Sequence, residues 1–314
     1  MILTDYFRSE KDVTWDFAKQ CGVNHGVIRL PEDAGFDITD KSHWKTVYNR
    51  FIGNGIKPIV IEPMPDSVHS HIKTGDCFRD ESIEKVIKMF PIMRELGINL
   101  ICFNWMAYVG WTRTSTNLPE RGGATVTGFD INDYIAKDNC MISKAELWDN
   151  YRYFLNAVID EAEKYEIKLA LHPDDPPLSE LGEVSRIMTS ANNIKKAIYD
   201  IYPSDMLGIT MCQACYYIMG EVLSEVIDMF ADKIFFVHFR NVVGNVNCFK
   251  ETFHDNGAID MAKIIKKYKS LGINVPIRVD HVPTFKSEQT DNAGYGNLGR
   301  LFALGYLKGL LDNY

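Results

Sequence analysis

One pattern recurs along this chain of 314 residues and limits the folds open to it. Each copy is a short apolar run that ends in polar residues, and a glycine corner precedes most of them. The apolar residues are continuous rather than alternating, which indicates strands that are covered on both faces, as in a parallel sheet. The runs occupy residues 2–8, 26–32, 55–63, 97–105, 166–174, 207–213, 233–241 and 272–281.

Amphipathic helices are predicted between these strands. Ser143 to Glu146 reads as a capping box, and the apolar residues from Leu147 to Ala162 then fall on one helical face. A second apolar stripe runs from Ile83 to Leu96 and closes at Gly97. Strand and helix alternating eight times at this length predict an α/β fold, a single-domain (β/α)8 TIM-type barrel over residues 1–314. A doubly wound open sheet is the alternative.

Composition narrows the classes of partner. A formal charge of −8 argues against nucleic acid or an anionic membrane surface as the main partner, because both require a basic face. The chain has no apolar run long enough for a membrane helix, and its first residues lack a signal-peptide pattern. Seven scattered cysteines fit a reducing compartment better than a disulfide framework. We therefore expect a cytoplasmic protein.

One connection between strand and helix is unusually long, at about residues 106–142. Connections of this length in a compact domain are usually functional, and this one follows the carboxyl end of a strand. We interpret it as a lid over the barrel mouth, with Gly122 and Gly123 as hinges. An inert surface insertion is the alternative interpretation.

Metal-ligating residue types end four successive strands, and active sites of such barrels lie at the strands' carboxyl ends. Each residue also has a structural explanation, such as a core cysteine or a helix cap, but four together favour a metal site. Two imidazoles, a thiolate and a carboxylate suit Mn²⁺, Fe²⁺, Co²⁺ or Zn²⁺ better than Mg²⁺ or Ca²⁺. A redox role for the Cys212–Cys215 pair is disfavoured, because no thioredoxin-like pattern surrounds it. The strand-end residues are His172, Cys212, His238 and Asp280, followed by His281.

Several segments resemble the mannonate dehydratase family, in the same order and nearly from end to end. The sequence HPDDPP together with the WTRT motif is the most specific part of the resemblance. The matching segments are 102–114, 172–177, 208–212, 238–240, 252–261, 278–281 and 292–301.

The resemblance implies a xylose-isomerase-like barrel that removes water from D-mannonate, or a close aldonate, to give 2-keto-3-deoxy-D-gluconate. It implies one Mn²⁺ or Fe²⁺ per chain, held by the four strand-end residues His172, Cys212, His238 and Asp280. His281 and Tyr295 match the proposed acid and base, whose order is left open. A homo-oligomer, as a dimer, is expected. The residues expected around the sugar acid are Asn104, Trp111, Arg113, Asp174, Asp175 and Arg240.

The chemistry explains these residue types. Loss of the C2 proton beside a carboxylate leaves a doubly charged ene-diolate, which a divalent ion can stabilise. Arg113 or Arg240 is suited to a bidentate contact with a carboxylate. A base then takes the C2 proton while an acid protonates the departing 3-hydroxyl.

The chain departs from the family pattern at three places, which are Gly110, Gln213 to Cys215 and Val282 to Phe285. It is also shorter than typical members. Changes around a retained metal set suggest a relative with a different sugar acid, so the reaction class is better supported than the substrate. A metal-dependent sugar or sugar-acid isomerase or epimerase is the alternative function, and a catalytically inactive binding protein is the third.

Overall fold

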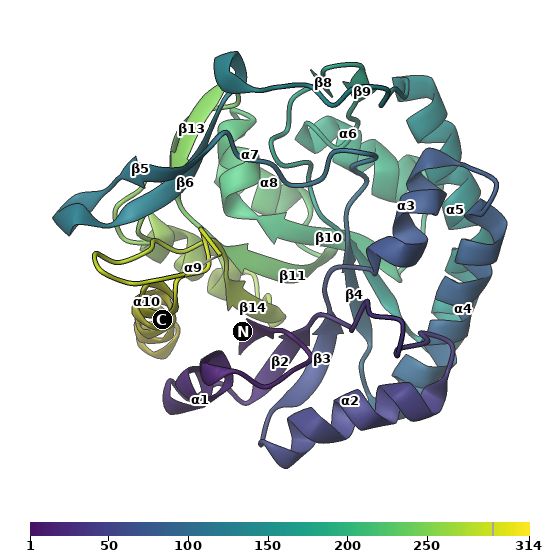
Figure 1. Ribbon diagram of the computed structural model, residues 1–314, viewed down its shortest axis with the longest axis horizontal. Coiled ribbons are helices and arrows are strands. Elements are labelled where there is room, and N and C mark those ends of the chain that lie inside the picture. Colours follow the sequence, from purple (N-terminus) through teal and green to yellow (C-terminus); the bar gives the residue numbers. More distant parts are fainter. Residues whose placement is uncertain (291) are drawn as a thin grey trace.

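Eight parallel strands close into a barrel in the computed structural model, which describes residues 1–290 and 292–314 (Figure 1). Every strand predicted from the sequence is present, and the single-domain TIM-type barrel is confirmed. The strands follow one another around the barrel in the order β1 (Ile2–Phe7), β14 (Pro276–Val279), β11 (Ile234–Phe239), β10 (Leu207–Cys212), β7 (Lys168–Leu171), β4 (Leu100–Phe103), β3 (Lys57–Ile61) and β2 (His25–Ile28).

Helices surround the barrel on the outside (Figure 1). The capping box before α5 is confirmed, since Ser143 Oγ accepts from the Glu146 amide at 3.2 Å and Glu146 Oε2 accepts from the Ser143 amide at 2.9 Å. No helix among the described residues is both long and apolar enough to cross a membrane. The helices are α1 (Val13–Gln20), α2 (Lys41–Gly53), α3 (Asp66–Thr74), α4 (Arg79–Leu96), α5 (Lys144–Tyr165), α6 (Ala191–Lys195, continued by a π-helical segment over Lys196–Ile201), α7 (Gln213–Ile218), α8 (Leu223–Met229), α9 (Met261–Ser270) and α10 (Asn297–Asn313).

The continuous apolar runs are explained by burial on both faces of the strands. All six residues of β10 and of β11 are buried. One face of each strand packs against the helices, in a core that extends around the barrel. Side chains that alternate with these fill the barrel interior, as expected for a closed sheet. This separate interior cluster consists of Val27, Val60, Leu100, Cys102, Ala170, Phe235 and Phe236.

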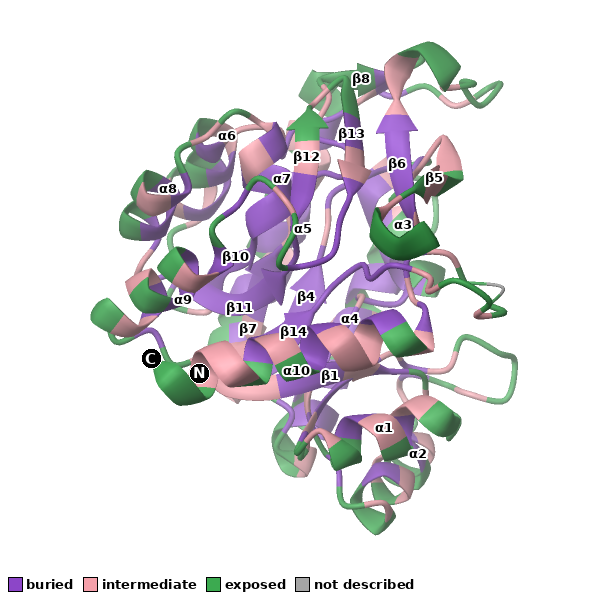
Figure 2. Ribbon diagram, turned by 90° about the vertical axis from the view of Figure 1, so that its left-hand side faces the viewer, coloured by how far each residue is buried: buried purple, intermediate pink, exposed green. Residues whose placement is uncertain are grey.

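The long connection after β4 is an ordered hairpin rather than an irregular loop. Its strands β5 (Ser115–Pro119) and β6 (Thr125–Asp130) join β12 (Val242–Asn245) and β13 (Cys248–Glu251) in an antiparallel sheet above the barrel (Figure 2). Gly122 and Gly123 lie between β5 and β6 with φ of 67° and 81°, so they serve as turn residues. The sequence did not predict this sheet, and the lid remains a prediction. A small third sheet pairs β8 (Glu180–Leu181) with β9 (Val184–Ser185).

Close packing of β10 against β11 predicts that Gly208 cannot gain a side chain without cost. A Cβ there would lie 2.4 Å from the Lys233 carbonyl oxygen and 2.5 Å from the Phe235 ring. We expect Gly208→Ala to destabilise the fold by about 1–3 kcal/mol in urea unfolding, because well-packed interiors resist added volume.

Gly305 in α10 is the matched control, because a Cβ there meets no atom within 4 Å. We expect Gly305→Ala to be neutral or to stabilise by up to about 1 kcal/mol, since alanine favours helix. A Gly208→Ala protein as stable as the wild type would contradict the packing of these two strands.

Candidate active site

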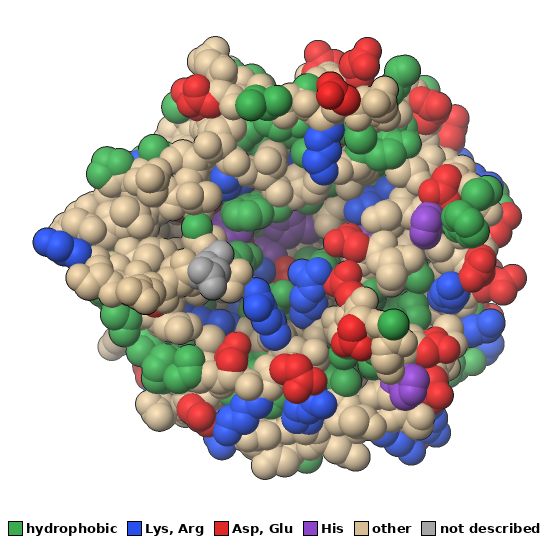
Figure 3. All heavy atoms as spheres, in the orientation of Figure 1, with side chains coloured by type: hydrophobic (Ala, Val, Ile, Leu, Met, Phe, Trp, Pro, Cys, Tyr) green, Lys and Arg blue, Asp and Glu red, His purple; other side chains and the backbone are tan. Residues whose placement is uncertain are grey.

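A cavity of 1410 Å³ opens at the carboxyl ends of the barrel strands. Histidine side chains lie at the bottom of the hollow in the centre of this face, and lysine and arginine side chains surround it (Figure 3). The volume exceeds the roughly 300–1,000 Å³ usual for a small-molecule site, so a sugar acid fits with room for water. The lining residues at the carboxyl ends of barrel strands or directly after them include Glu62, Asn104, His172, His238, Asp280 and His281.

The four predicted metal ligands converge at this face. Cys212, His238 and Asp280 each offer a ligand atom within 4.8 Å of the other two. His172 Nε2 lies 3.2 Å from His238 Nδ1, and Asp280 Oδ2 lies 3.5 Å from the same His238 nitrogen. Each residue comes from a different barrel strand or its end. The geometry brings the set together, and metal binding itself remains a prediction.

The outer nitrogen of each histidine faces an oxygen. His172 Nδ1 lies 2.6 Å from the Pro173 carbonyl oxygen, and His238 Nε2 lies 2.9 Å from Glu62 Oε1. Oxygens at these positions favour protons on the outer nitrogens, so His172 Nε2 and, once its second proton is released, His238 Nδ1 are the inward electron-pair donors. The residues present therefore fit a divalent metal ion.

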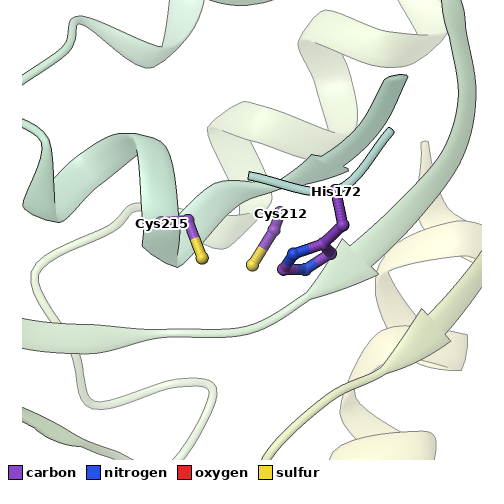
Figure 4. Close-up of side chains that lie close together, drawn as sticks. All are labelled: His172, Cys212 and Cys215. Carbon is purple, nitrogen blue, oxygen red and sulfur yellow. The ribbon is translucent and has the colours of Figure 1, made fainter. Parts of the chain in front are cut away.

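Two buried thiols lie side by side near His172, with Cys212 between His172 and Cys215 (Figure 4). Their sulfur atoms and a His172 nitrogen lie within 4.8 Å of one another. Burial opposes ionisation of Cys212, but Cys215, Arg240 and the two histidines lower its pKa well below the ordinary value. Burial and the adjacent Cys212 raise the pKa of Cys215 well above it. These directions suit Cys212 to the predicted role of a thiolate ligand, with Cys215 as the neighbouring thiol.

Arg278 connects Asp280, one of the predicted metal ligands, with Glu62 at the end of a distant strand. Its Nε and Nη2 donate to Glu62 at 2.8 and 2.9 Å, and its Nη1 donates to Asp280 Oδ1 at 2.9 Å. The other oxygen of Asp280 is the one near His238. Burial opposes ionisation of Asp280, but Arg278, His281 and His238 hold its pKa well below the ordinary value. Arg278 thus orients the carboxylate and keeps it charged.

Arg113, Arg240, Asp175 and Glu251 form a buried charge quartet. Arg113 donates to Asp175 Oδ1 at 2.8 Å and to Glu251 Oε1 at 2.6 Å. Arg240 donates to Asp175 Oδ2 at 2.7 Å and to the two Glu251 oxygens at 2.9 and 2.6 Å. Neither guanidinium lines the cavity, although both were predicted to contact the sugar acid. In this structure the two arginines hold carboxylates of the protein.

The predicted catalytic residues lie together at the cavity wall. The His281 and Tyr295 rings are 5.5 Å apart in an edge arrangement, and the Trp111 ring lies 5.0 Å from His281. His281 Nδ1 lies 3.1 Å from Glu251 Oε1, which ties this histidine to the quartet. The backbone of His281 has φ of 35°, a left-handed conformation that is rare outside glycine and that clusters at functional sites.

The two acids of the HPDDPP motif, Asp174 and Asp175, lie in different environments. Asp175 belongs to the quartet and reaches the cavity wall. Asp174 is fully buried, accepts a hydrogen bond from the Met188 amide at 2.9 Å and does not line the cavity. Asn104 lines the cavity as predicted.

Sequence reasoning left Glu251, Arg278 and Lys73 without a role at the site. Glu251 lies in the β12–β13 hairpin, outside the strand-end pattern. Arg278 carried a usable signal, because it stands two residues before Asp280, and alternate strand residues share a face. Lys73 lies on α3 and offered no signal.

The fold is that of the xylose-isomerase-like barrels, with a site at the strand ends. A xylose isomerase domain protein from Planctomyces limnophilus matches with a TM-score of 0.63 and 14% identity, over 99% of this chain and 97% of that one. A mannonate dehydratase structure from Streptococcus suis serotype 2 matches with a TM-score of 0.90 and 27% identity, over 100% and 94%.

The family is shown by sequence. The profile of D-mannonate dehydratase (UxuA) matches residues 2–141 and 134–314. A mannonate dehydratase from Streptococcus agalactiae serotype III (strain NEM316) is 33% identical over 98% of this chain and 96% of its own length. This chain belongs to the mannonate dehydratase family. The alignment spans 342 positions, more than the 314 residues here, so the relative carries insertions that this chain lacks.

The convergence of donors predicts that His172→Ala and Cys212→Ser each lose bound metal in elemental analysis after loading with Mn²⁺. Each change removes one inward donor from the set. Cys77→Ser is the matched control, because Cys77 is exposed and should keep full occupancy. Full occupancy in both site variants would show that the ligands are assigned wrongly.

The quartet predicts that Glu251→Gln destabilises the protein by about 3–5 kcal/mol at neutral pH, because it leaves two buried guanidinium charges with only the carboxylate of Asp175 to compensate them. Burial alone would raise the pKa of Glu251, but Arg240, Arg113 and His281 hold it at about 2, below the ordinary 4.5. A depressed pKa stabilises the folded state fully above the ordinary value, and this contribution disappears as pH falls towards 2.

The difference in unfolding free energy between wild type and Glu251→Gln should therefore be constant above pH 4.5 and shrink below it. Denaturant unfolding across this range measures it. Glu95→Gln is the control, since its contact with Lys45 at 3.4 Å is exposed and exposed pairs contribute little. A difference that does not change with pH would mean that the charge of Glu251 is not responsible.

Proposed function

We propose that this chain dehydrates D-mannonate, or a close aldonate, to 2-keto-3-deoxy-D-gluconate with Mn²⁺ or Fe²⁺. One observation carries the proposal, which is that three of the four donors, His172, His238 and Asp280, line the same cavity as the His281–Tyr295 pair. The fourth donor, Cys212, is buried with its sulfur within 4.8 Å of ligand atoms of His238 and Asp280. Family membership supports the reaction class. The cytoplasmic location and the dimer remain predictions.

His172, Cys212, His238 and Asp280 would hold the metal ion. Their two imidazoles, thiolate and carboxylate match the ligand preferences of Mn²⁺ and Fe²⁺. When bound, the ion supplies Lewis-acid stabilisation of negative charge on the substrate. Burial and Arg278 oppose a charge on His238, but Glu62 and Asp280 raise its pKa well above the ordinary value. Metal binding should therefore release a proton from this histidine.

His281 is suited to take the proton from C2. Glu251 lies 3.1 Å from its Nδ1, which favours a proton on that nitrogen and leaves Nε2 free to accept another. The same carboxylate stabilises the imidazolium that forms. Arg113 and Arg240 in turn hold Glu251 in place.

Tyr295 is suited to protonate the departing 3-hydroxyl. Burial raises the pKa of Tyr295 above its ordinary value, so the phenol keeps its proton until the reaction. The C2 proton passes to His281, the C3–O bond breaks, and the hydroxyl leaves as water with the tyrosine proton. The enol that remains tautomerises to the 2-keto-3-deoxy acid. Each proton transfer typically contributes about 10²–10⁴-fold.

An isomerase or epimerase function has less support. The xylose isomerase domain protein shares only 14% of its residues with this chain, which establishes the fold alone. The departures from the family pattern bear on the substrate instead, since Gly110 lines the cavity where the family has an acid. A smaller residue there admits an aldonate of different shape.

The function is tested by loading the purified protein with Mn²⁺ or Fe²⁺ and offering a panel of aldonates and uronates. We expect a 2-keto-3-deoxy acid from D-mannonate or from one of its close relatives in the panel. Ketose formation from an aldose or uronate, with no keto acid from any aldonate, would instead establish the isomerase.

Tyr295→Phe tests the role of the phenol within this reaction. We expect kcat to fall by about 10²–10⁴-fold, because the leaving hydroxyl loses its proton donor, while elemental analysis finds the metal retained. Tyr153→Phe, on the exposed side of α5, is the matched control and should leave turnover unchanged. Normal turnover in Tyr295→Phe would remove Tyr295 from the mechanism.

A further inference from the structure

Lys73 is a buried cation that faces the cavity without a carboxylate partner. Its side chain lies on α3, the residue is only 4% exposed, and it lines the cavity with Asn104. The hydrogen bond recorded for its ammonium is a long one, 3.4 Å to Asn104 Oδ1. That oxygen also accepts from the Met106 amide at 3.1 Å. Within the described residues Lys73 forms no ion pair, so two of its three N–H groups have no protein acceptor.

The other cations that line the cavity are already compensated or exposed. Arg278 faces Glu62 and Asp280. Arg29 and Arg300 contact acidic side chains as well, Glu32 and Asp5 respectively. Arg8 lies at the exposed rim and donates to an amide oxygen, that of Asn292, at 3.1 Å. Lys73 therefore differs from all of them in being both buried and without a carboxylate.

Burial of an unpaired charge is costly, so its retention calls for a physical reason. Burial lowers the pKa of Lys73 to about 8, and Asp66 and Asp174 act against this shift from outside ion-pair distance. The side chain is therefore still mainly charged at neutral pH. An anion that enters the cavity would supply the missing charge and accept the free N–H groups.

We propose that Lys73 binds the carboxylate of the sugar acid. The inference rests on the proposed function and deepens it, because it assigns the group that recognises the substrate's one negative charge. It also replaces the arginines expected in this role, since Arg113 and Arg240 already hold Asp175 and Glu251. Asn104 positions the ammonium through its side-chain oxygen.

The position of this charge affects both binding and turnover. Removal of the C2 proton places further negative charge on the carboxylate, so an ammonium beside it stabilises the transition state more than the bound substrate. Loss of Lys73 should thus raise KM and lower kcat together. A side chain that only fills space would not distinguish a charged substrate from a neutral one.

The test compares D-mannonate with its neutral amide, D-mannonamide, by calorimetric titration of the Mn²⁺-loaded protein. Titrations use the Tyr295→Phe background so that bound substrate is not consumed. In Lys73→Met we expect affinity for mannonate to fall by about 10–100-fold, the usual range for a hydrogen bond to a charged group. Affinity for mannonamide should stay unchanged, and Lys73→Arg should recover part of the loss for mannonate.

Lys45→Met is the matched control, because Lys45 is an exposed lysine on α2, and it should leave both affinities unchanged. Metal content is measured in every variant. Lys73→Gln, which keeps a donor towards Asn104, serves if Lys73→Met does not fold. An equal loss for mannonate and mannonamide, or no loss for either, would overturn the assignment and leave Lys73 as a structural counter-charge for Asp174.

The two proposals fail in different ways. Calorimetry reports binding, whereas the aldonate panel reports product. Carboxylate-dependent binding without any keto acid would overturn the dehydratase and support the role of Lys73. Keto acid formation with no change in carboxylate discrimination in Lys73→Met would overturn the role of Lys73 and support the dehydratase.

Discussion

Compensation of buried charge at the barrel mouth is the constraint on which the site depends. Arg278 on β14 reaches Glu62 after β3 and Asp280 after its own strand, so one guanidinium connects distant strand ends. Glu62 in turn lies beside His238 on β11. Removal of one partner from such a buried network leaves a charge that the interior cannot solvate. The network therefore orients two of the four predicted metal ligands, His238 and Asp280.

The antiparallel sheet above the barrel contributes residues to the buried charge contacts of the site. Glu251 in β13 accepts hydrogen bonds from Arg113 in the long connection and from Arg240, which follows β11. Glu251 also contacts His281, which follows β14. Backbone pairing of β6 with β13 keeps these segments together. The long connection, which the sequence predicts to be a lid, thus contributes Arg113 to the contacts of Glu251, the carboxylate that lies 3.1 Å from the proposed base His281.

Regular features of the fold could be predicted from the sequence, but the pairing of its charges could not. Continuous apolar runs located all barrel strands, and the rule that sites lie at strand ends brought His172, Cys212, His238 and Asp280 together. Arg113 and Arg240 were expected to contact the substrate because arginine binds carboxylates well. Residue type does not show that carboxylates of the protein itself, Asp175 and Glu251, already occupy both guanidinium groups. Glu251 was missed since a hairpin inserted between strand and helix follows no barrel periodicity.

The balance of buried charge in the cavity also affects which sugars can bind there. A divalent ion would compensate the Cys212 thiolate and share the Asp280 carboxylate with Arg278. Among the residues that the structure describes, Lys73 is then the buried cation of the cavity without a carboxylate partner. A sugar acid with one carboxylate neutralises that charge, whereas a neutral sugar of the same size leaves it buried and unpaired. Discrimination of this kind rests on the cost of the wrong ligand as much as on contacts with the right one. The barrel scaffold is compatible with neutral or acidic sugars, and the role proposed for the buried ammonium is to select the acids.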